Sequence, residues 1–199
     1  MKTTRRDRVA PMRREDASDL EPVFRAFEEN TGTLPNNLLV MARRPTLLRA
    51  RAAMMAALKE TTLDRGIRDL VFLMASLTTG CRYCQAHRTN AMLRRGSHEE
   101  KLRAVWEFET SPLFSEAERA ALRLARDAAV VPNAVTDEHF VELGRHFTEE
   151  QIIDIVAQAC NAAWSNRWND TMATPLEPDP IASMAKVDPA WDPGMNRPR

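Results

Sequence analysis

Two cysteines and a histidine, each three positions after the last, are the residues of this chain best suited to chemistry. Cys81 and Cys84 enclose Arg82-Tyr83, and His87 follows Cys84 by three positions. On a helix this spacing places both thiols on adjacent positions of one face, close enough to form a disulfide. If the helix begins near Cys81, the unsatisfied N–H groups of its first turn favour a thiolate. The pattern therefore predicts a reactive dithiol.

The spacing also assigns different roles to the two sulfurs. At about 100° per residue, His87 can reach Cys84 but hardly Cys81. The imidazole can accept the thiol proton or stabilise the thiolate, and Arg88, which falls between the two sulfurs around the axis, can lower the same pKa. We therefore expect Cys84 to be the nucleophile and Cys81 to resolve its oxidised form as a disulfide.

A carboxylate twelve positions before the pair is a candidate partner for the histidine. If the chain reverses at residues 78–80, Asp69 comes level with about residue 91, roughly one helical turn from His87. There it could orient the imidazole or exchange protons with it. Asp69 could equally be a solvated acid near a helix N-terminus. The spacing leaves both interpretations open.

Other uses of the thiols are haem, zinc and simple burial. Covalent haem would need a histidine directly after the second cysteine, where the chain has Gln85. Zinc remains an alternative with Cys81, Cys84 and His87 as ligands, but a structural site needs a fourth. The residues that could supply it are Cys160, His98, His139 and His146. Because aliphatic residues surround Cys160, we expect it to be an inert core thiol.

The elements that must position these residues are helices. Apolar residues recur every three or four positions in segments covering about 20–31, 38–41, 46–58, 64–78 and 81–96. Asp64 is a candidate N-cap for the fourth of these segments. Capping boxes at Ser97 with Glu100, Ser115 with Glu118 and Thr148 with Gln151 predict three more helix starts. Since no convincing alternation with a period of two occurs, the predicted fold class is all-α.

Composition sets further limits on the chain of 199 residues. Lys and Arg number 28 and Asp and Glu number 28, a balance that argues against a nucleic-acid binder. No apolar run approaches the roughly 18 to 20 residues of a membrane span, and no secretory signal is recognised, so a cytoplasmic location is expected. Residues 1–18 are predicted to be a flexible basic arm, 19–178 a single helical domain, and 179–199 a Pro-rich extended tail.

Two motifs together resemble a known family. They are Leu77-Thr-Thr-Gly-Cys-Arg-Tyr-Cys84 with its preceding acid, and the phrase Asn166-Arg-Trp-Asn that opens the segment ending at Glu177. Both resemble the alkylhydroperoxidase D and carboxymuconolactone decarboxylase family, over most of the chain outside its ends. The resemblance implies a multi-helix bundle in which a helical hairpin carries the cysteine pair, assembled as a trimer-based or dimer-based homo-oligomer.

The resemblance also implies an activity. Peroxidase members of the family reduce hydroperoxides with the second cysteine, which matches Cys84, and resolve it with the first, which matches Cys81. They need no cofactor or metal, and a lipoylated or thioredoxin-like dithiol protein returns them to the reduced state. The leading expectation is thus a thiol-dependent peroxidase of antioxidant defence. The alternatives are a cofactor-free lyase like the decarboxylase branch, which generally lacks the pair, and a non-catalytic redox-sensing oligomer.

The chain departs from the peroxidase pattern at three positions. The family's acid is usually Glu and is here Asp69. Its relay histidine usually lies four positions after the second cysteine, where this chain has Arg88 and offers His87 one position earlier. A further histidine before the second cysteine is here Tyr83. Tyr83 and Arg88 are expected to tune the thiols, and Trp168 to line the pocket beside them.

Overall fold

The computed structural model describes residues 8–198, which form helices and no strand. The all-α prediction is therefore confirmed. Three short 3-10 helices cover Arg14–Leu20, Ala104–Glu107 and Gly194–Asn196. The α-helices are α1 (Glu21–Thr31), α2 (Asn36–Met41), α3 (Pro45–Ala57), α4 (Arg65–Thr78), α5 (Arg82–Arg94), α6 (Glu99–Arg103), α7 (Glu116–Ala128), α8 (Asp137–Leu143), α9 (Glu149–Met172) and α10 (Pro178–Val187).

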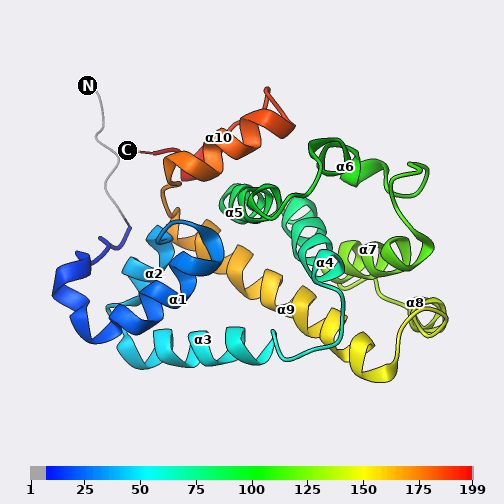
Figure 1. Cartoon of the computed structure of the whole chain (residues 1–199), viewed down its shortest axis with the longest axis horizontal. Helices are drawn as coiled ribbons and strands as arrows, with labels where there is room; N and C mark the ends of the chain where they lie inside the picture. The colour runs from blue at the N-terminus through cyan, green and yellow to red at the C-terminus, as the bar shows by residue number, and fades with distance from the viewer. Residues whose placement is uncertain (1–7, 199) are drawn as a thin grey trace.

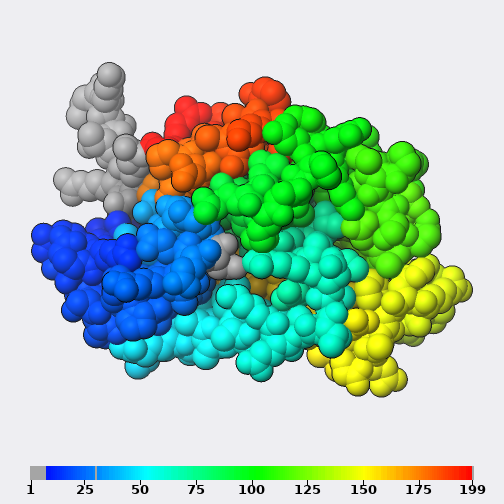
Figure 2. Space-filling model, viewed as in Figure 1, coloured from blue at the N-terminus to red at the C-terminus, as the bar shows by residue number. Residues whose placement is uncertain are grey.

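Helix α4 lies at the centre of the bundle and packs against α5, α7 and α9 (Figure 1). Its side chains are buried without interruption from Asp69 to Ser76, as its broad apolar stripe requires. Helix α10 lies on α5 at the opposite side from α3. The blue N-terminal elements form one end of the molecule, and the green and yellow elements from α6 to α8 form the other (Figure 2).

The buried apolar residues form three clusters. The largest joins α4, α7 and α9 through side chains such as Leu122 and Ile155. A second cluster, which includes Phe72 and Tyr83, contains both Cys81 and Cys84. A third is built by the N-terminal elements, and the aromatic rings of α9 pack against it. The cysteine pair thus belongs to a packed core and does not lie on a surface loop.

The reversal between α4 and α5 has a defined hydrogen-bond pattern. Gly80 adopts a φ of 75°, in the left-handed region that favours glycine. Its N–H donates to the carbonyl of Leu77 at 3.1 Å, and the N–H of Cys81 donates to that of Ser76 at 3.1 Å. These two bonds make a Schellman motif that ends α4. Because Cys81 is also the N-cap of α5, the turn itself positions the dithiol.

Most predicted helix starts are confirmed, and one is wrong. Asp64 accepts a hydrogen bond from the N–H of Ile67 at 3.1 Å, and the capping boxes that begin at Ser115 and Thr148 are formed. Helix α6 instead begins after His98, without a side-chain cap. Ser97 lies one residue before the N-cap position, and its N–H donates to the carbonyl of Met92 at 3.0 Å, as part of the turn that ends α5.

Helix α8 was not expected from the sequence. Its N-cap is Thr136, and the third helical position is His139, whose Nδ1 accepts a hydrogen bond from the N–H of Thr136 at 3.1 Å. Glu or Gln ordinarily fills that position of a capping box. A search for acidic or amide partners therefore misses this helix.

The first part of the predicted flexible arm is outside the described residues, and the second part is folded. Residues 1–7 are not described. From Arg14 the chain forms a 3-10 helix in which Ala17 is buried. The guanidinium of Arg14 pairs with Glu21 at 2.8 Å and Glu28 at 3.0 Å on α1. The prediction of a free arm is therefore wrong for residues 14–18, because acids on α1 bind its arginine.

The prediction of an extended tail at 179–199 is also wrong. The segment begins with α10, which starts at Pro178 and buries Met184 in the cluster around the cysteines. Proline is tolerated in the first turn of a helix, where its missing N–H would have no intrahelical partner. The prolines at 178 and 180 therefore mark a helix start. In the described part of the chain, no helix combines the length and the apolar character needed to span a bilayer.

Replacing the cap of α7 tests this account of the helix starts. Ser115→Ala removes the acceptor of the Glu118 N–H and is expected to lower the free energy of unfolding by about 1 kcal/mol. Ser97→Ala is the matched control, because Ser97 caps no helix. Urea unfolding followed by circular dichroism measures both changes, and equal losses would contradict the assignment.

Candidate active site

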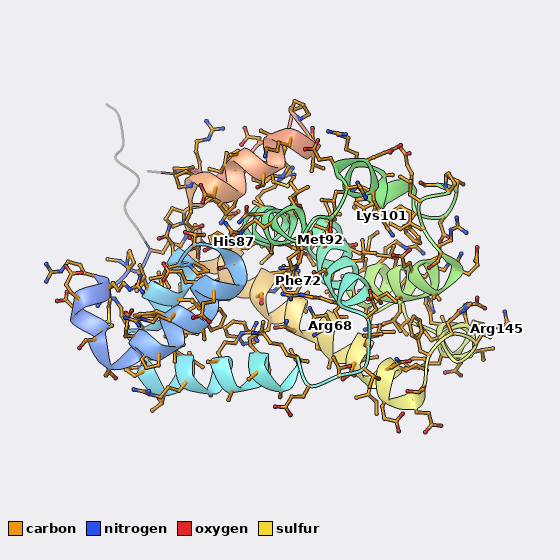
Figure 3. All side chains as sticks on the ribbon, in the orientation of Figure 1. Arg68, Phe72, His87, Met92, Lys101 and Arg145 are labelled. Atoms are coloured by element: carbon orange, nitrogen blue, oxygen red, sulfur yellow. The ribbon has the colours of Figure 1, made fainter. Side chains whose placement is uncertain are left out.

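A cavity of about 110 Å³ lies beside the cysteine pair. It opens between the N-terminal helices and the inner faces of α4, α5 and α9. Of the two cysteines only Cys84 lines it. In Figure 3, His87 and Phe72, two of its lining residues, lie near the middle of the molecule, far from Arg145. The lining comprises Phe27, Thr31, Pro35, Asn37, Leu38, Met41, Arg51, Met55, Phe72, Tyr83, Cys84, His87, Arg88, Ala91, Trp164, Ser165 and Asn169.

The sulfur of Cys84 sits in the first turn of α5 with one side-chain donor. The amide Nδ2 of Asn169 donates to its Sγ at 3.3 Å. The hydroxyl of Thr174 donates to the Oδ1 of Asn169 at 3.2 Å, which fixes the orientation of that amide. A donor at this distance and the N-terminus of α5 both favour negative charge on sulfur. The amide of Asn169 and the N-terminus of α5 are thus the groups that face the sulfur of Cys84.

Cys81 differs from Cys84 in exposure and in electrostatics. It is 0% exposed, against 3% for Cys84, and it does not line the cavity. Hydrogen bonding to Cys84, together with burial, raises the pKa of the Cys81 thiol well above its usual value. Cys81 is therefore the thiol of the pair that is held protonated. This asymmetry agrees with a nucleophile at Cys84, whose catalytic role stays a prediction.

His87 binds a carboxylate that sequence reasoning did not single out. Its Nε2 lies 2.6 Å from the Oε2 of Glu177, the N-cap residue of α10. The other carboxylate oxygen accepts the hydroxyl of Tyr83 at 3.0 Å and the backbone N–H of Asn36. The imidazole also stacks on the Tyr83 ring, with centroids 4.3 Å apart. The result is a His–Glu–Tyr cluster at the wall of the cavity.

The cluster holds a buried negative charge. Burial would raise the pKa of Glu177, but the charge and hydrogen bond of His87 and the N–H of Asn36 outweigh it, so the net pKa is lowered. Burial, and then the charge of Glu177, raise the pKa of Tyr83 well above its usual range. Tyr83 thus remains a hydrogen-bond donor, and Glu177 remains ionised to orient or exchange protons with His87.

The structure does not bring Asp69 to His87. The hairpin register agrees with the expectation, since Asp69 contacts α5 on both sides of residue 91. Its partners, however, are Arg88, at 2.5 Å, and Arg95. Arg88 and Arg95 share one face of α5, whereas His87 lies about 100° away from Arg88. Asp69 therefore joins the two helices through an ion pair, and Glu177 occupies the place beside the imidazole.

Of the other predicted pocket residues, Arg88 lines the cavity and Trp168 does not. Arg88 lines the cavity, but its charge is paired with Asp69 and its guanidinium lies 4.0 Å over the Phe72 ring. Trp168 is not among the lining residues. It stacks on Trp164, with centroids 5.3 Å apart, and Trp164 is the ring that faces the cavity.

Cys160 is exposed, so the prediction of a core thiol is wrong. The buried residues Ile155, Ala159 and Ala162 follow one stripe of α9. At about 100° per residue, Cys160 points roughly 100° away from Ala159 and toward the side of the exposed Ile153. Neighbouring aliphatic residues in the sequence therefore did not indicate burial, because helical geometry separates adjacent positions.

Three residues of the site, Asn169, Glu177 and Arg51, were not predicted individually from the sequence. Asn169 and Glu177 lie in the C-terminal segment that carried the family resemblance, so a signal for them was present in the sequence. Arg51 stands in a segment of α3 where its neighbours gave no sign that it faces a cavity. In residues 8–198 no three or more His, Cys, Asp and Glu side chains are grouped closely enough to hold a metal ion.

Sequence comparisons find the same family in part of the chain. The model of the carboxymuconolactone decarboxylase family matches residues 45–127. The uncharacterized protein YnjA of Escherichia coli is 31% identical over 119 residues, which make up 60% of this chain and 65% of that protein. The match thus spans slightly less than two thirds of the length of this curated relative.

Solved structures extend the similarity to nearly the whole chain. The debrominase Bmp8 in its apo form is 35% identical, with a TM-score of 0.86 over 91% of this chain and 98% of its own. A cysteine-to-alanine variant of Bmp8 in complex with 2,3,4-tribromopyrrole is similar to the same degree, with a TM-score of 0.87. An uncharacterized peroxidase-related protein from Ralstonia eutropha, with an alkylhydroperoxidase core, is 23% identical over 82% of this chain and 88% of its own, with a TM-score of 0.71, and shares the fold.

The carboxylate of Glu177 is expected to make stability depend on pH. Its folded pKa is lowered below the ordinary 4.5, so its contribution is fully present above pH 4.5 and is lost as the pH falls through the folded pKa. Glu177→Gln should therefore destabilise the protein most near pH 7 and progressively less in acid. Urea unfolding across this pH range measures the difference, with the exposed Glu60→Gln as control. If the stability difference between wild type and Glu177→Gln stayed constant with pH, a buried, ionised Glu177 would be contradicted.

The ion pair of Asp69 predicts a larger, structural effect. Asp69→Asn leaves Arg88 and Arg95 without their buried carboxylate and is expected to lower the free energy of unfolding by about 3 kcal/mol. Asp19→Asn breaks the exposed pair with Arg49 and should change stability much less. Thermal and urea unfolding compare the two variants. A loss at Asp69 no larger than that at Asp19 would show that the pair does not join α4 to α5.

Proposed function

Because the chain belongs to the alkylhydroperoxidase D and carboxymuconolactone decarboxylase family, we propose that it is a dithiol oxidoreductase that reduces an electrophilic substrate, with hydroperoxides as the leading class. One observation carries the proposal. Cys84 lines the cavity, while Cys81, three positions earlier, is fully buried and does not line it. A nucleophile at the cavity and a resolving thiol behind it form the arrangement that a two-step dithiol reaction needs.

The proposed reaction with a hydroperoxide has two steps. The Cys84 thiolate attacks the terminal oxygen, the O–O bond breaks, and the departing alkoxide takes a proton to leave as an alcohol. The product on the enzyme is a sulfenic acid at Cys84. The Cys81 thiol then attacks that sulfur, the S–O bond breaks, and water leaves as the disulfide closes. His87, held by Glu177, is the group placed to move protons at the cavity wall.

The similarity to Bmp8 favours reductive dehalogenation as a second candidate. The same thiolate would attack a ring-bound bromine, the C–Br bond would break, and the ring carbon would take a proton. Cys81 would then attack the sulfenyl bromide and release bromide as the disulfide forms. Atoms and electrons balance as in the peroxide reaction, because the substrate is again the two-electron oxidant. The two candidates therefore use one dithiol and differ in the bond that the substrate offers.

Both reactions end with a disulfide between Cys81 and Cys84, which needs two electrons from outside to turn over. We propose a dithiol protein or small dithiol as this reductant. Both sulfurs are buried, with at most 3% of either residue exposed. A reductant must therefore reach Cys84 through the cavity, or the hairpin must open to admit it.

Cysteine variants test the proposal directly. The reduced protein is mixed with cumene hydroperoxide in one series and with 2,3,4-tribromopyrrole in another, and thiol loss and product are followed by stopped flow and mass spectrometry. Cys84→Ser is expected to slow the reaction at least about 100-fold. Cys81→Ser should react once and stop, leaving an oxidised Cys84 that dimedone traps in the peroxide series. Cys160→Ser, the matched control at an exposed position, should behave like the wild type.

The outcomes also separate the alternatives. Turnover with either substrate, lost in Cys84→Ser, supports a dithiol reductase, and the faster series identifies the bond that is cleaved. If wild-type protein reacts no faster than Cys84→Ser with both substrates, the dithiol proposal is refuted. The lyase interpretation is then favoured. Oxidation to the disulfide without turnover, in the presence of dithiothreitol or dihydrolipoamide, would instead indicate a redox sensor.

A further inference from the structure

Arg51 lines the cavity beside Cys84 and carries an unpaired guanidinium nitrogen. It lies on α3, and its Nη2 donates to the side chains of Asn161 and Ser165, the second at 2.9 Å. The guanidinium also stacks at 4.6 Å from the centre of the Trp164 ring. These contacts hold the group in one orientation. The other terminal nitrogen, Nη1, is buried and has no hydrogen-bond partner in the described part of the chain.

The charge of Arg51 also has no carboxylate to balance it among the described residues. Its two side-chain acceptors are neutral, and within residues 8–198 no carboxylate forms an ion pair with it. Arg88, the second arginine of the lining, has its charge matched by Asp69. Among the described residues, the cavity lining contains no Asp or Glu. Burial lowers the pKa of Arg51 to about 10 against the opposing effect of the Cys84 sulfur, so Arg51 stays protonated at neutral pH. The lining therefore holds one guanidinium that no carboxylate of the described chain neutralises.

Buried donors with no acceptor cost free energy, and a buried charge without a partner costs more. Such a group in a closed core would be strongly destabilising, whereas in a ligand pocket the ligand supplies the missing acceptor. Asn37, on the same lining, also has a buried side-chain oxygen without a partner. One of the unpaired polar groups around this cavity is thus a charged donor, the guanidinium of Arg51. An acceptor on a ligand would give it a hydrogen-bond partner.

The rest of the lining suits a flat apolar body. The rings of Phe27, Phe72, Tyr83 and Trp164 face the cavity. Its volume of about 110 Å³ is close to that of cavities known to hold one benzene ring, which are about 150 Å³. The cavity is therefore of the size of a single small ring.

We propose that Arg51 is the anion-recognition residue of this cavity and that the substrate is a small aromatic molecule bearing one carboxylate, phenolate or similar ionised group. The guanidinium of Arg51 binds that group, and the ring packs among the aromatic side chains with its reactive atom at Cys84. The reactive end of the proposal rests on the proposed function. The recognition itself does not, since binding needs no turnover.

The experiment measures binding in the Cys84→Ser background, where no dithiol reaction occurs. Isothermal titration calorimetry compares benzoate with benzamide, a neutral molecule of nearly the same shape. Benzoate is expected to bind more tightly. Adding Arg51→Gln should weaken benzoate binding by about 10- to 100-fold and benzamide binding by less than about threefold. Arg49→Gln, an exposed arginine on the same helix, is the matched control and should change neither.

Arg51→Lys keeps the charge without the forked geometry and covers the case in which Arg51→Gln does not fold. It should weaken benzoate binding yet preserve the preference over benzamide. Equal binding of the two probes before mutation, or equal loss of both in an Arg51 variant, would overturn the proposal. Failure of the dithiol proposal has a different signature, since it appears in the peroxide and bromide assays and leaves these affinities unchanged.

Discussion

The reversal between α4 and α5 is the constraint on which the rest of the site depends. Gly80 in the left-handed region lets α4 end and α5 begin within a few residues. The N–H of Cys81 donates to the carbonyl of Ser76 at the end of α4, and Cys81 is also the N-cap of α5. Cys84 is thereby fixed in the first turn of α5, where backbone N–H groups favour a thiolate. The same turn sets the register that pairs Asp69 with Arg88 of α5 and with Arg95, the C-cap residue of that helix. A longer loop would leave the thiols, the register and the cavity wall unspecified.

The buried charged groups around this turn differ in the partners that they contact. Asp69 is matched by two guanidinium groups and acts between helices. Glu177 is matched by His87 and Tyr83 and faces the cavity wall. Arg51 has neutral hydrogen-bond partners, and no carboxylate of the described residues pairs with it. Since a buried charge without a counter-ion is costly, this difference separates residues that hold the fold together from the residue that is available to a ligand.

The folded chain explains its departures from the family pattern in physical terms. Where peroxidase members usually have a relay histidine four positions after the second cysteine, this chain has Arg88, and the arginine joins α5 to α4 through Asp69. The histidine one position earlier faces another direction and meets the carboxylate of Glu177 at the start of α10. A histidine with a carboxylate is thus present beside Cys84, although the acid comes from a different part of the chain.

The sequence alone determined the helical class, most helix starts, the hairpin and its register, and the unequal roles expected of Cys81 and Cys84. These follow from local rules: apolar periodicity, capping residues, the glycine at the turn, and spacing within one helix. Exposure of Cys160 could not be deduced from its aliphatic neighbours, because burial depends on which side of α9 faces the bundle.

Only the tertiary structure decided which carboxylate meets His87, that α10 covers the dithiol, and that Arg51 points into the cavity. Glu177 lies 90 positions from His87 along the chain, and Arg51 lies 110 and 114 positions from the side chains it binds. Contacts over such separations depend on how whole helices pack. Local preferences place a residue on a helix face, but the packing of the other helices decides what that face meets.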